Sequence, residues 1–240
     1  MKKAVPIGMF LLALCCVSLS YGFQFDDLLR GPKSPAKSGM DNGTIVSGLK
    51  EALTVGTGNA VASLSKVDGY FGNQTVKIPL PEKVQTVANV LGKLGYQKQV
   101  DDFVLSMNRA AEKAAPKAKT IFVDAIRQMT FEDAKNILSG GNTAATNYFR
   151  SKTSAKIFEA FKPAISSSMN EVGVTNAYKA MIGKYTAAIP FARTESLDLD
   201  TYVTNKATDG LFYMVGEEEK RIRTDPAARV TDLLKKVFGH

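Results

Sequence analysis

The sequence predicts an all-α fold, a single compact multi-helix domain of about eight or nine helices with one short extended segment near residues 67–81. Three observations predict it. Apolar residues recur every three or four positions along most of the chain after residue 43, which is the period of one buried helical face. Capping residues, prolines and glycines interrupt this pattern at helix-length intervals. Only residues 67–81 depart from the helical period, and we find no internal repeat.

The N-terminus has the order of a secretory signal peptide. Lys2 and Lys3 precede an apolar run over residues 7–17, and Ser20 and Gly22 then supply small side chains before a cut at residue 23. The run is shorter than the roughly 20 residues that span a bilayer. A lipoprotein is the alternative, although the residues before the two cysteines are poor for lipoprotein processing. We expect an exported protein with no transmembrane segment after signal removal.

Three regions follow from this order. Residues 1–22 form the signal peptide, residues 23–43 an N-terminal segment with a flexible Gly-, Pro-, Ser- and Lys-containing linker, and residues 44–240 the helical domain. Both cysteines, Cys15 and Cys16, lie in the signal. The mature chain is therefore expected to be free of cysteine and of disulfides.

The first half of the domain reads as four helices and one break. Asp41 or Asn42 caps a helix that reaches residue 64, in which two glycines indicate close packing. Turn signals and prolines over residues 67–81 predict either a small β element or an irregular surface loop. Helices are then expected over about 81–94, ended by Gly95, over about 98–115, and from Pro116 onward.

The second half continues in the same way. Thr130 begins a short capped helix with acidic residues in its first turn, and a longer helix after Gly141 contains Pro163, which we expect to kink or break it. Helices follow over residues 175–185 and 199–223. Asp225 and the proline after it are expected to start a last helix that carries four apolar residues: Val230, Leu233, Leu234 and Val237.

The charge pattern argues against nucleic acid. The formal net charge of +8 is spread along the chain, and the densest charged run, residues 217–223, mixes both signs. Glu217 with Arg221 and Glu219 with Arg223 are i,i+4 pairs, so this run reads as a solvated helix face. With export, we expect no nucleic-acid partner.

The residue types exclude several kinds of catalysis. The single histidine, His240, is the last residue, so a serine–histidine–aspartate triad lacks a positioned imidazole. Cysteine and histidine zinc sites and histidine-ligated haem are excluded for the mature chain for the same reason. Phosphate-binding glycine motifs are also missing. We therefore expect no cofactor, no metal site and no assignable catalytic residue.

Carboxylates remain as candidates for chemistry. A hydrolase that uses carboxylates or an isolated serine is the alternative function, with Glu112, Glu132 and Asp133 as the acids to test. Glu132 and Asp133 are explained at least as well as first-turn charges that stabilise a helix start. A third alternative is a peripheral protein whose positive charge and residues 23–29 touch a lipid surface.

Six residues are the candidates for contact with a ligand or partner. Asn108, Arg109 and Glu112 share one part of a helix beside its apolar face. Arg109 and Glu112 form either an ion pair or a contact that orients a ligand headgroup or holds a partner helix. Phe212, Tyr213 and Met214 are three consecutive large side chains that must point in different directions. At least one of them must be exposed, at an interface or next to a cavity. The many aromatic and methionine residues form either an ordinary core or the lining of an apolar cavity.

Six segments along the domain carry a family resemblance. They are residues 48–53, 78–81, 103–112, 129–134, 140–146 and 209–213. Together and in this order they resemble a bacterial family of exported proteins catalogued as the domain of unknown function numbered 4197. The resemblance covers about residues 41–239 and implies a location in the bacterial envelope, in the periplasm, but it supplies no activity and no catalytic residue.

The sequence thus favours a non-enzymatic binding protein. The candidate partners are a lipid or other apolar or amphiphilic small molecule, or another protein of the envelope.

Overall fold

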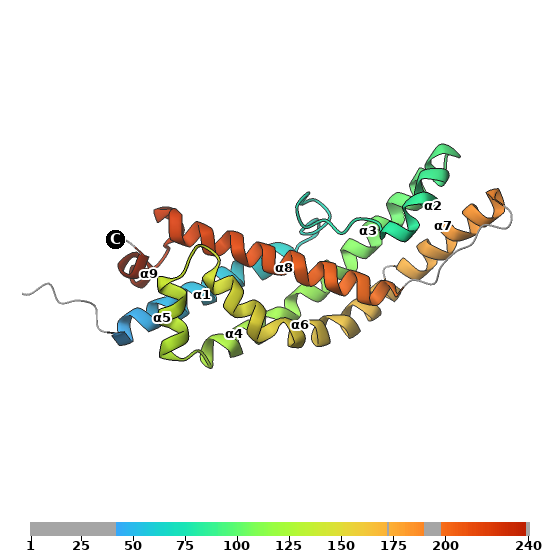
Figure 1. Ribbon diagram of the computed structural model, residues 1–240. Helices are drawn as coiled ribbons and strands as arrows, with labels where there is room; N and C mark the ends of the chain where they lie inside the picture. Colours follow the sequence, from blue (N-terminus) through green and yellow to red (C-terminus); the bar gives the residue numbers. More distant parts are fainter. Residues whose placement is uncertain (1–41, 172, 190–197, 239–240) are drawn as a thin grey trace, which may run out of the picture. The chain divides into compact units, whose positions relative to one another are not determined.

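The computed structural model describes residues 42–171, 173–189 and 198–238 (Figure 1). The predicted signal peptide, most of the linker and the C-terminal histidine lie outside these residues. The described residues form nine α-helices and two short 3-10 helices, with no strand among them. Their bounds are α1 Asn42–Leu64, α2 Glu82–Lys93, α3 Gln97–Ala114, η2 Ala115–Lys117, α4 Ala118–Arg127, α5 Phe131–Ser139, α6 Ala144–Glu171, α7 Val174–Ala188, α8 Leu199–Thr224, η3 Pro226–Ala228 and α9 Asp232–Phe238. The all-α prediction is confirmed.

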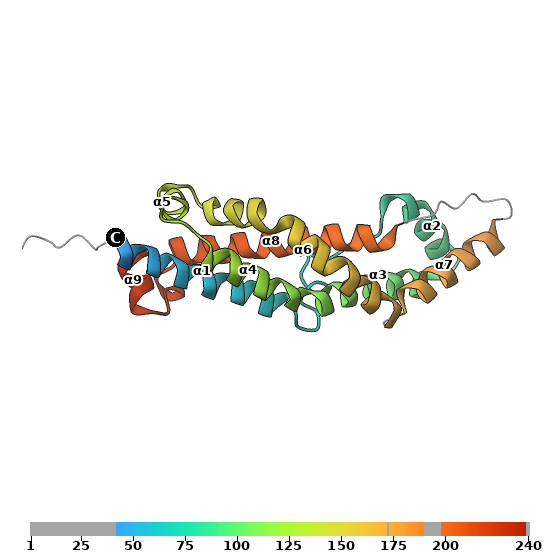
Figure 2. The same ribbon diagram turned by 90° about the horizontal axis from the view of Figure 1, so that it is seen from below.

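Helices α1, α3, α6 and α8 form the centre of the domain. Helix α6 packs against α8, α3 and α4, and α1 packs against α8, α4 and α9. Helices α2 and α7 pack against each other and against α3 (Figures 1 and 2). The core between the helices contains five buried phenylalanines, which are Phe103, Phe122, Phe149, Phe161 and Phe212.

The apolar period predicts the inward faces correctly for most helices. In α6, Phe149, Ile157, Phe161 and Ile165 recur at multiples of four residues and all are buried, because that spacing keeps side chains on one helical face. The aromatic residues of this set belong to the core. Phe122 makes an edge-to-face contact with Phe149 at a centroid distance of 5.1 Å.

The predicted helix start at Thr130 is confirmed in detail. The backbone N–H of Asp133 donates to the Thr130 hydroxyl at 3.1 Å, and the backbone N–H of Thr130 donates to the Asp133 carboxylate at 3.0 Å. This reciprocal pair is a capping box. It also lowers the pKa of Asp133, because the two groups of Thr130 that donate to the carboxylate favour its charged form.

Pro163 does not break α6, which is continuous from Ala144 to Glu171. The proline ring lies on the exposed side of the helix. The carbonyl that loses its helical donor, that of Glu159, belongs to an exposed residue and can bond water, while the buried stripe passes the proline uninterrupted.

The C-terminal region also differs from its prediction. Asp225 accepts from the backbone N–H of Ala227 at 2.9 Å, but it begins only a 3-10 turn, and the last helix starts at Asp232. Val230 therefore lies before the last helix rather than in it, and it is 65% exposed.

Residues 65–81 form an irregular segment of turns and extended backbone, which we call the α1–α2 loop. The prediction of a small β element is wrong, because the segment contains no strand. The alternative, a surface loop, is only half right. Tyr70, Val76 and Ile78 of this loop are buried and belong to the hydrophobic core.

Candidate functional site

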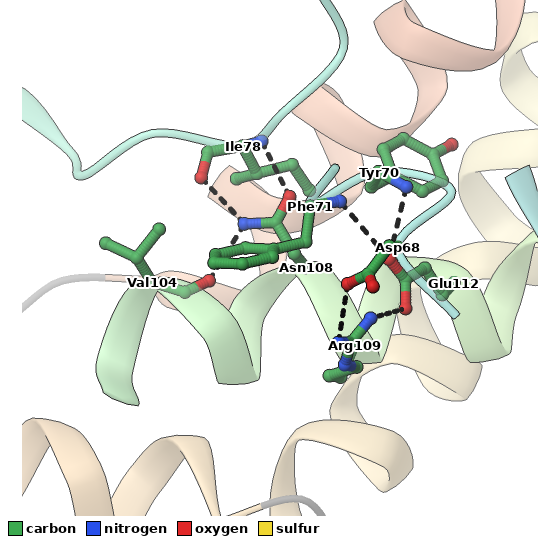
Figure 3. Close-up of polar contacts among 8 residues, drawn as sticks. All are labelled: Asp68, Tyr70, Phe71, Ile78, Val104, Asn108, Arg109 and Glu112. Atoms are coloured by element: carbon green, nitrogen blue, oxygen red, sulfur yellow. Dashed lines mark hydrogen bonds and ion pairs between the residues drawn. The ribbon is translucent and has the colours of Figure 1, made fainter. Parts of the chain in front are cut away.

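Asn108 of α3 holds the extended end of the α1–α2 loop. Its side-chain amide pairs with both backbone groups of Ile78: the Oδ1 atom accepts from the Ile78 N–H at 2.8 Å, and Nδ2 donates to the Ile78 carbonyl at 2.9 Å (Figure 3). Nδ2 also donates to the Val104 carbonyl at 2.8 Å. Asn108 and Ile78 are both 0% exposed. The asparagine therefore replaces the strand partner that an extended segment lacks in an all-helical protein.

Glu112, one turn further along α3, holds the turn at the start of the loop. Its Oε1 atom accepts from the backbone N–H groups of Tyr70 and Phe71 at 3.1 and 3.2 Å. Its Oε2 atom accepts from Arg109 at 2.6 Å. Glu112 is buried, so its negative charge is balanced by one guanidinium and two oriented amide groups.

Arg109 connects this carboxylate to the rim of the loop. Its other terminal nitrogen donates to Asp68 at 2.7 Å, and its guanidinium lies 5.8 Å from the centroid of the Phe71 ring (Figure 3). The hydrogen bond with Glu112 is the largest of the effects that raise the pKa of Arg109, so the guanidinium stays charged. Asp68, which forms this ion pair with Arg109, adopts a left-handed backbone conformation with φ of 66°.

Tyr70 carries the loop across to α8. Its hydroxyl donates to the Ala207 carbonyl at 2.7 Å, and the whole side chain is buried. Burial, with the nearby negative charge of Glu112, raises the pKa of Tyr70, so the phenol remains neutral. A Cβ atom on Gly210 of α8 would come within 2.9 Å of the Tyr70 ring and 3.2 Å of Val76. Glycine at this position therefore lets the loop lie directly on the helix.

The three predicted polar residues thus bind the protein's own loop. No buried side-chain nitrogen or oxygen of the described residues lacks a hydrogen-bond partner, and all three side chains form hydrogen bonds within the chain. Arg109 and Glu112 form the ion pair that was one of the interpretations of the sequence. Together Asn108, Arg109 and Glu112 fix the inner side of the α1–α2 loop.

The other three predicted residues lie on α8 and point in different directions, as expected. Phe212 is 1% exposed, with its ring 6.2 Å from that of Phe122. Tyr213 is 43% exposed. Met214 is partly buried, and Asn73 of the α1–α2 loop donates to its sulfur at 3.7 Å. The same loop therefore touches both groups of predicted residues, α3 on one side and α8 on the other.

A surface depression lies where the outer side of this loop meets α8. Its volume is about 490 Å³, and we call it the α8 hollow. The lining is half polar and includes charged groups of both signs. The residues that line it are Asn73, Thr75, Tyr213, Met214, Glu217, Glu218, Lys220, Arg221 and Thr224.

Sequence reasoning missed the burial of two acids of α8, Glu218 and Glu219. Glu219 accepts from the backbone N–H groups of Ala145 and Thr146 at 2.9 and 2.8 Å, and so caps the first turn of α6. The predicted pair with Arg223 exists at 2.9 Å, but both side chains are largely buried. The prediction of a fully solvated face is therefore wrong for this pair, since α6 packs on that side of α8.

The neighbouring acid differs from its prediction too. Arg221 pairs with Glu218 at 3.2 Å, an i,i+3 contact, where the sequence predicts Glu217. Glu218 is also buried, and Asn59 of α1 donates to it at 3.1 Å. Glu217, Glu218 and Glu219 are consecutive, and the sequence does not indicate which two of them face neighbouring helices.

The carboxylates offer little for acid catalysis. Asp133 belongs to the capping box and has a lowered pKa, and Glu112 is occupied by three donors. Glu132 is exposed in the first turn of α5. The other described carboxylates with a clearly shifted pKa, Glu171 and Asp198, are lowered by hydrogen bonds. A general acid at neutral pH needs the opposite shift.

Among the described helices, none combines the length and the apolarity needed to cross a membrane.

One family model matches the chain over residues 39–239, and its description is protein of unknown function, DUF4197. No curated protein and no solved structure matches the chain.

Proposed function

Because this chain belongs to the DUF4197 family of proteins of unknown function, we propose its function from its own geometry: a non-enzymatic binding protein that recognises a protein partner through the α8 hollow. The proposed partner is a protein of the bacterial envelope, and the signal-like N-terminus supports this choice. The segment bound in the hollow is a short polar stretch with charges of both signs, to match the glutamate, lysine and arginine side chains of the lining.

One observation carries this proposal: the α1–α2 loop, which forms one wall of the hollow, is held in place by α3 on its opposite side. Buried hydrogen bonds and an ion pair from α3 hold its inner side, and its outer side supplies Asn73 and Thr75 to the hollow. A wall that is already ordered loses little conformational entropy when a partner binds. Tyr213 adds an exposed aromatic side chain, the kind that most often dominates binding at protein interfaces.

The alternative of a carrier for an apolar molecule has less support. The apolar cavity among α1, α5, α6 and α8 has a volume of about 20 Å³. That is the space of about one water molecule. It is lined by core residues such as Leu53 and Phe149, and it has no room for an acyl chain.

Site-specific photocrosslinking in the native bacterium tests the proposal. A photoreactive amino acid is placed at Tyr213, and for comparison at Ser151, an exposed residue of α6 that does not line the hollow. We expect one protein to crosslink at position 213 and not at position 151. Mass spectrometry then identifies that protein for purification.

Binding of the purified partner gives the quantitative result. Tyr213→Ala should weaken binding by about tenfold or more, which is about 1.4 kcal/mol of binding free energy. Tyr213→Phe keeps the ring and should retain most of the affinity. Equal crosslinking at both positions, or unchanged affinity in Tyr213→Ala, would overturn the proposal.

A further inference from the structure

A second depression lies on another part of the domain, between α4, the start of α5 and α6. Its volume is about 330 Å³, within the range of small-molecule sites, and we call it the α4–α6 cleft. Helices α4 and α6 pack against each other, and α5 packs against α6 beside them (Figures 1 and 2). No residue of the α8 hollow lines this cleft.

The apolar part of the cleft comes from both long walls. Ile121 and Ala125 are one turn apart on α4, and Tyr148 faces them from α6. The Tyr148 hydroxyl donates to the Ala125 carbonyl at 3.2 Å, which holds the ring in place. The partly buried phenol has a raised pKa, mainly because of desolvation, so it stays a neutral donor. This side of the cleft suits an apolar or aromatic group.

Positive charge lines the α6 wall. Lys152 and Lys156 follow Tyr148 at i+4 and i+8, and therefore stand in a row along the cleft. Neither lysine takes part in an ion pair of the described residues. The Lys152 ammonium lies 5.9 Å from the centroid of the Tyr148 ring. Two unpaired ammonium groups side by side attract a carboxylate.

Negative charge stands at the other walls. Asp133, at the start of α5, is fixed by the capping box, which leaves its Oδ1 atom free of the Thr130 contacts. Asp124 and Gln128 of α4 complete that side, with Asp124 in a long ion pair of 3.6 Å to Arg127. These carboxylates repel a simple anion and attract an ammonium group.

We propose that the α4–α6 cleft binds a free amino acid or short peptide, with its carboxylate at Lys152 and Lys156, its ammonium group at Asp133 and Asp124, and an apolar side chain against Tyr148. A cleft that combines apolar side chains with lysines from α6 and carboxylates from α4 and α5 matches a zwitterion with an apolar side chain. Inorganic phosphate offers no group for the carboxylates, and a lipid chain offers none for either set of charges. This site does not depend on the α8 hollow.

NMR titration of the isotope-labelled full mature chain tests the proposal. The probes are L-phenylalanine, the dipeptide alanyl-phenylalanine, its N-acetylated form, its C-terminal amide and inorganic phosphate. We expect amide shifts around the cleft with the unmodified dipeptide or with phenylalanine. Blocking either terminus of the dipeptide should weaken its binding by about tenfold, because each block removes one charge.

A matched pair of variants locates the binding. Lys156→Gln should weaken binding by about tenfold, and Lys119→Gln, an exposed lysine of α4 outside the cleft, should leave it unchanged. Both side chains are exposed, so both variants are expected to fold.

Three results would overturn the proposal. They are the absence of shifts with both unmodified probes, equal binding of the blocked dipeptides, and phosphate binding that matches the dipeptide in its dependence on Lys156. Phenylalanine binding as strongly as the dipeptide would support a free amino acid as the ligand. Tighter binding of the dipeptide would support a peptide.

Discussion

Replacing Asn108 with alanine removes the side chain that satisfies both backbone groups of Ile78. These groups are buried, and the structure gives their hydrogen bonds with the asparagine at 2.8 and 2.9 Å. Leaving one buried donor or acceptor unpaired costs about 1–3 kcal/mol. Two such groups give a loss of about 2–6 kcal/mol in the free energy of unfolding. The third bond, to Val104, adds little because that carbonyl also accepts the ordinary helical bond.

Chemical denaturation measures the loss, and hydrogen exchange locates it. We expect the Ile78 amide to exchange much faster in Asn108→Ala than in the unmodified protein, because its only side-chain acceptor is gone. Asn89→Ala is the matched control: this asparagine is exposed on α2, and its replacement should change stability by less than about 0.5 kcal/mol. A comparable small change in Asn108→Ala, with unaltered exchange at Ile78, would refute the reasoning.

Asn108→Asp separates hydrogen bonding from packing. The shapes are nearly equal, but an ionised carboxylate places oxygen against the Ile78 and Val104 carbonyls, where the amide donates. The folded protein therefore raises the pKa of this aspartate. Relative to the unmodified protein at the same pH, this variant should be most stable at low pH, where the protonated acid can donate, and should become less stable as the pH rises. A stability difference between the two proteins that does not grow with rising pH would contradict the assigned hydrogen bonds.

Three further predictions concern the contacts of α8. Gly210→Ala should destabilise the protein by about 1–3 kcal/mol, because the new methyl group meets the α1–α2 loop. Gly216→Ala on the same helix has ordinary contact distances and should be neutral or stabilising by up to about 1 kcal/mol. Equal denaturation midpoints for the two variants would contradict the close approach of the loop to Gly210. Glu219→Gln removes the anion of a largely buried ion pair and should lower the free energy of unfolding by about 3–5 kcal/mol. Glu217 is exposed, so Glu217→Gln should change it by less than about 0.5 kcal/mol. Thermal or urea unfolding measures the difference between the two variants. The pKa of Tyr70 is raised in the folded protein, so the neutral phenol contributes its full stability below the unfolded pKa of 10.0, and this contribution is lost as the pH rises above that value. Tyr70→Phe should therefore reduce the fall in the free energy of unfolding that denaturation measures at high pH. An unchanged fall would show that other groups cause it.

Local patterns account for most of what the sequence predicts correctly. The helices, the capping box at Thr130 and the ends of most elements depend on residues three or four positions apart, which interact within one turn. The buried stripe of α6 follows from the same period. Pro163 misleads because whether a proline breaks a helix depends on which side faces solvent, and neighbouring helices decide that.

The sequence by itself thus determined the all-α class, most of the helix bounds and the candidate side chains of α3 and α8. Only the tertiary structure decided what those side chains do. The partners of Asn108 and Glu112 lie 30 and about 40 positions away in the chain, and Glu219 caps a helix that begins more than 70 positions earlier. A buried polar group is stabilised by whichever group the fold brings within hydrogen-bond distance, and sequence spacing carries no information on such distant neighbours.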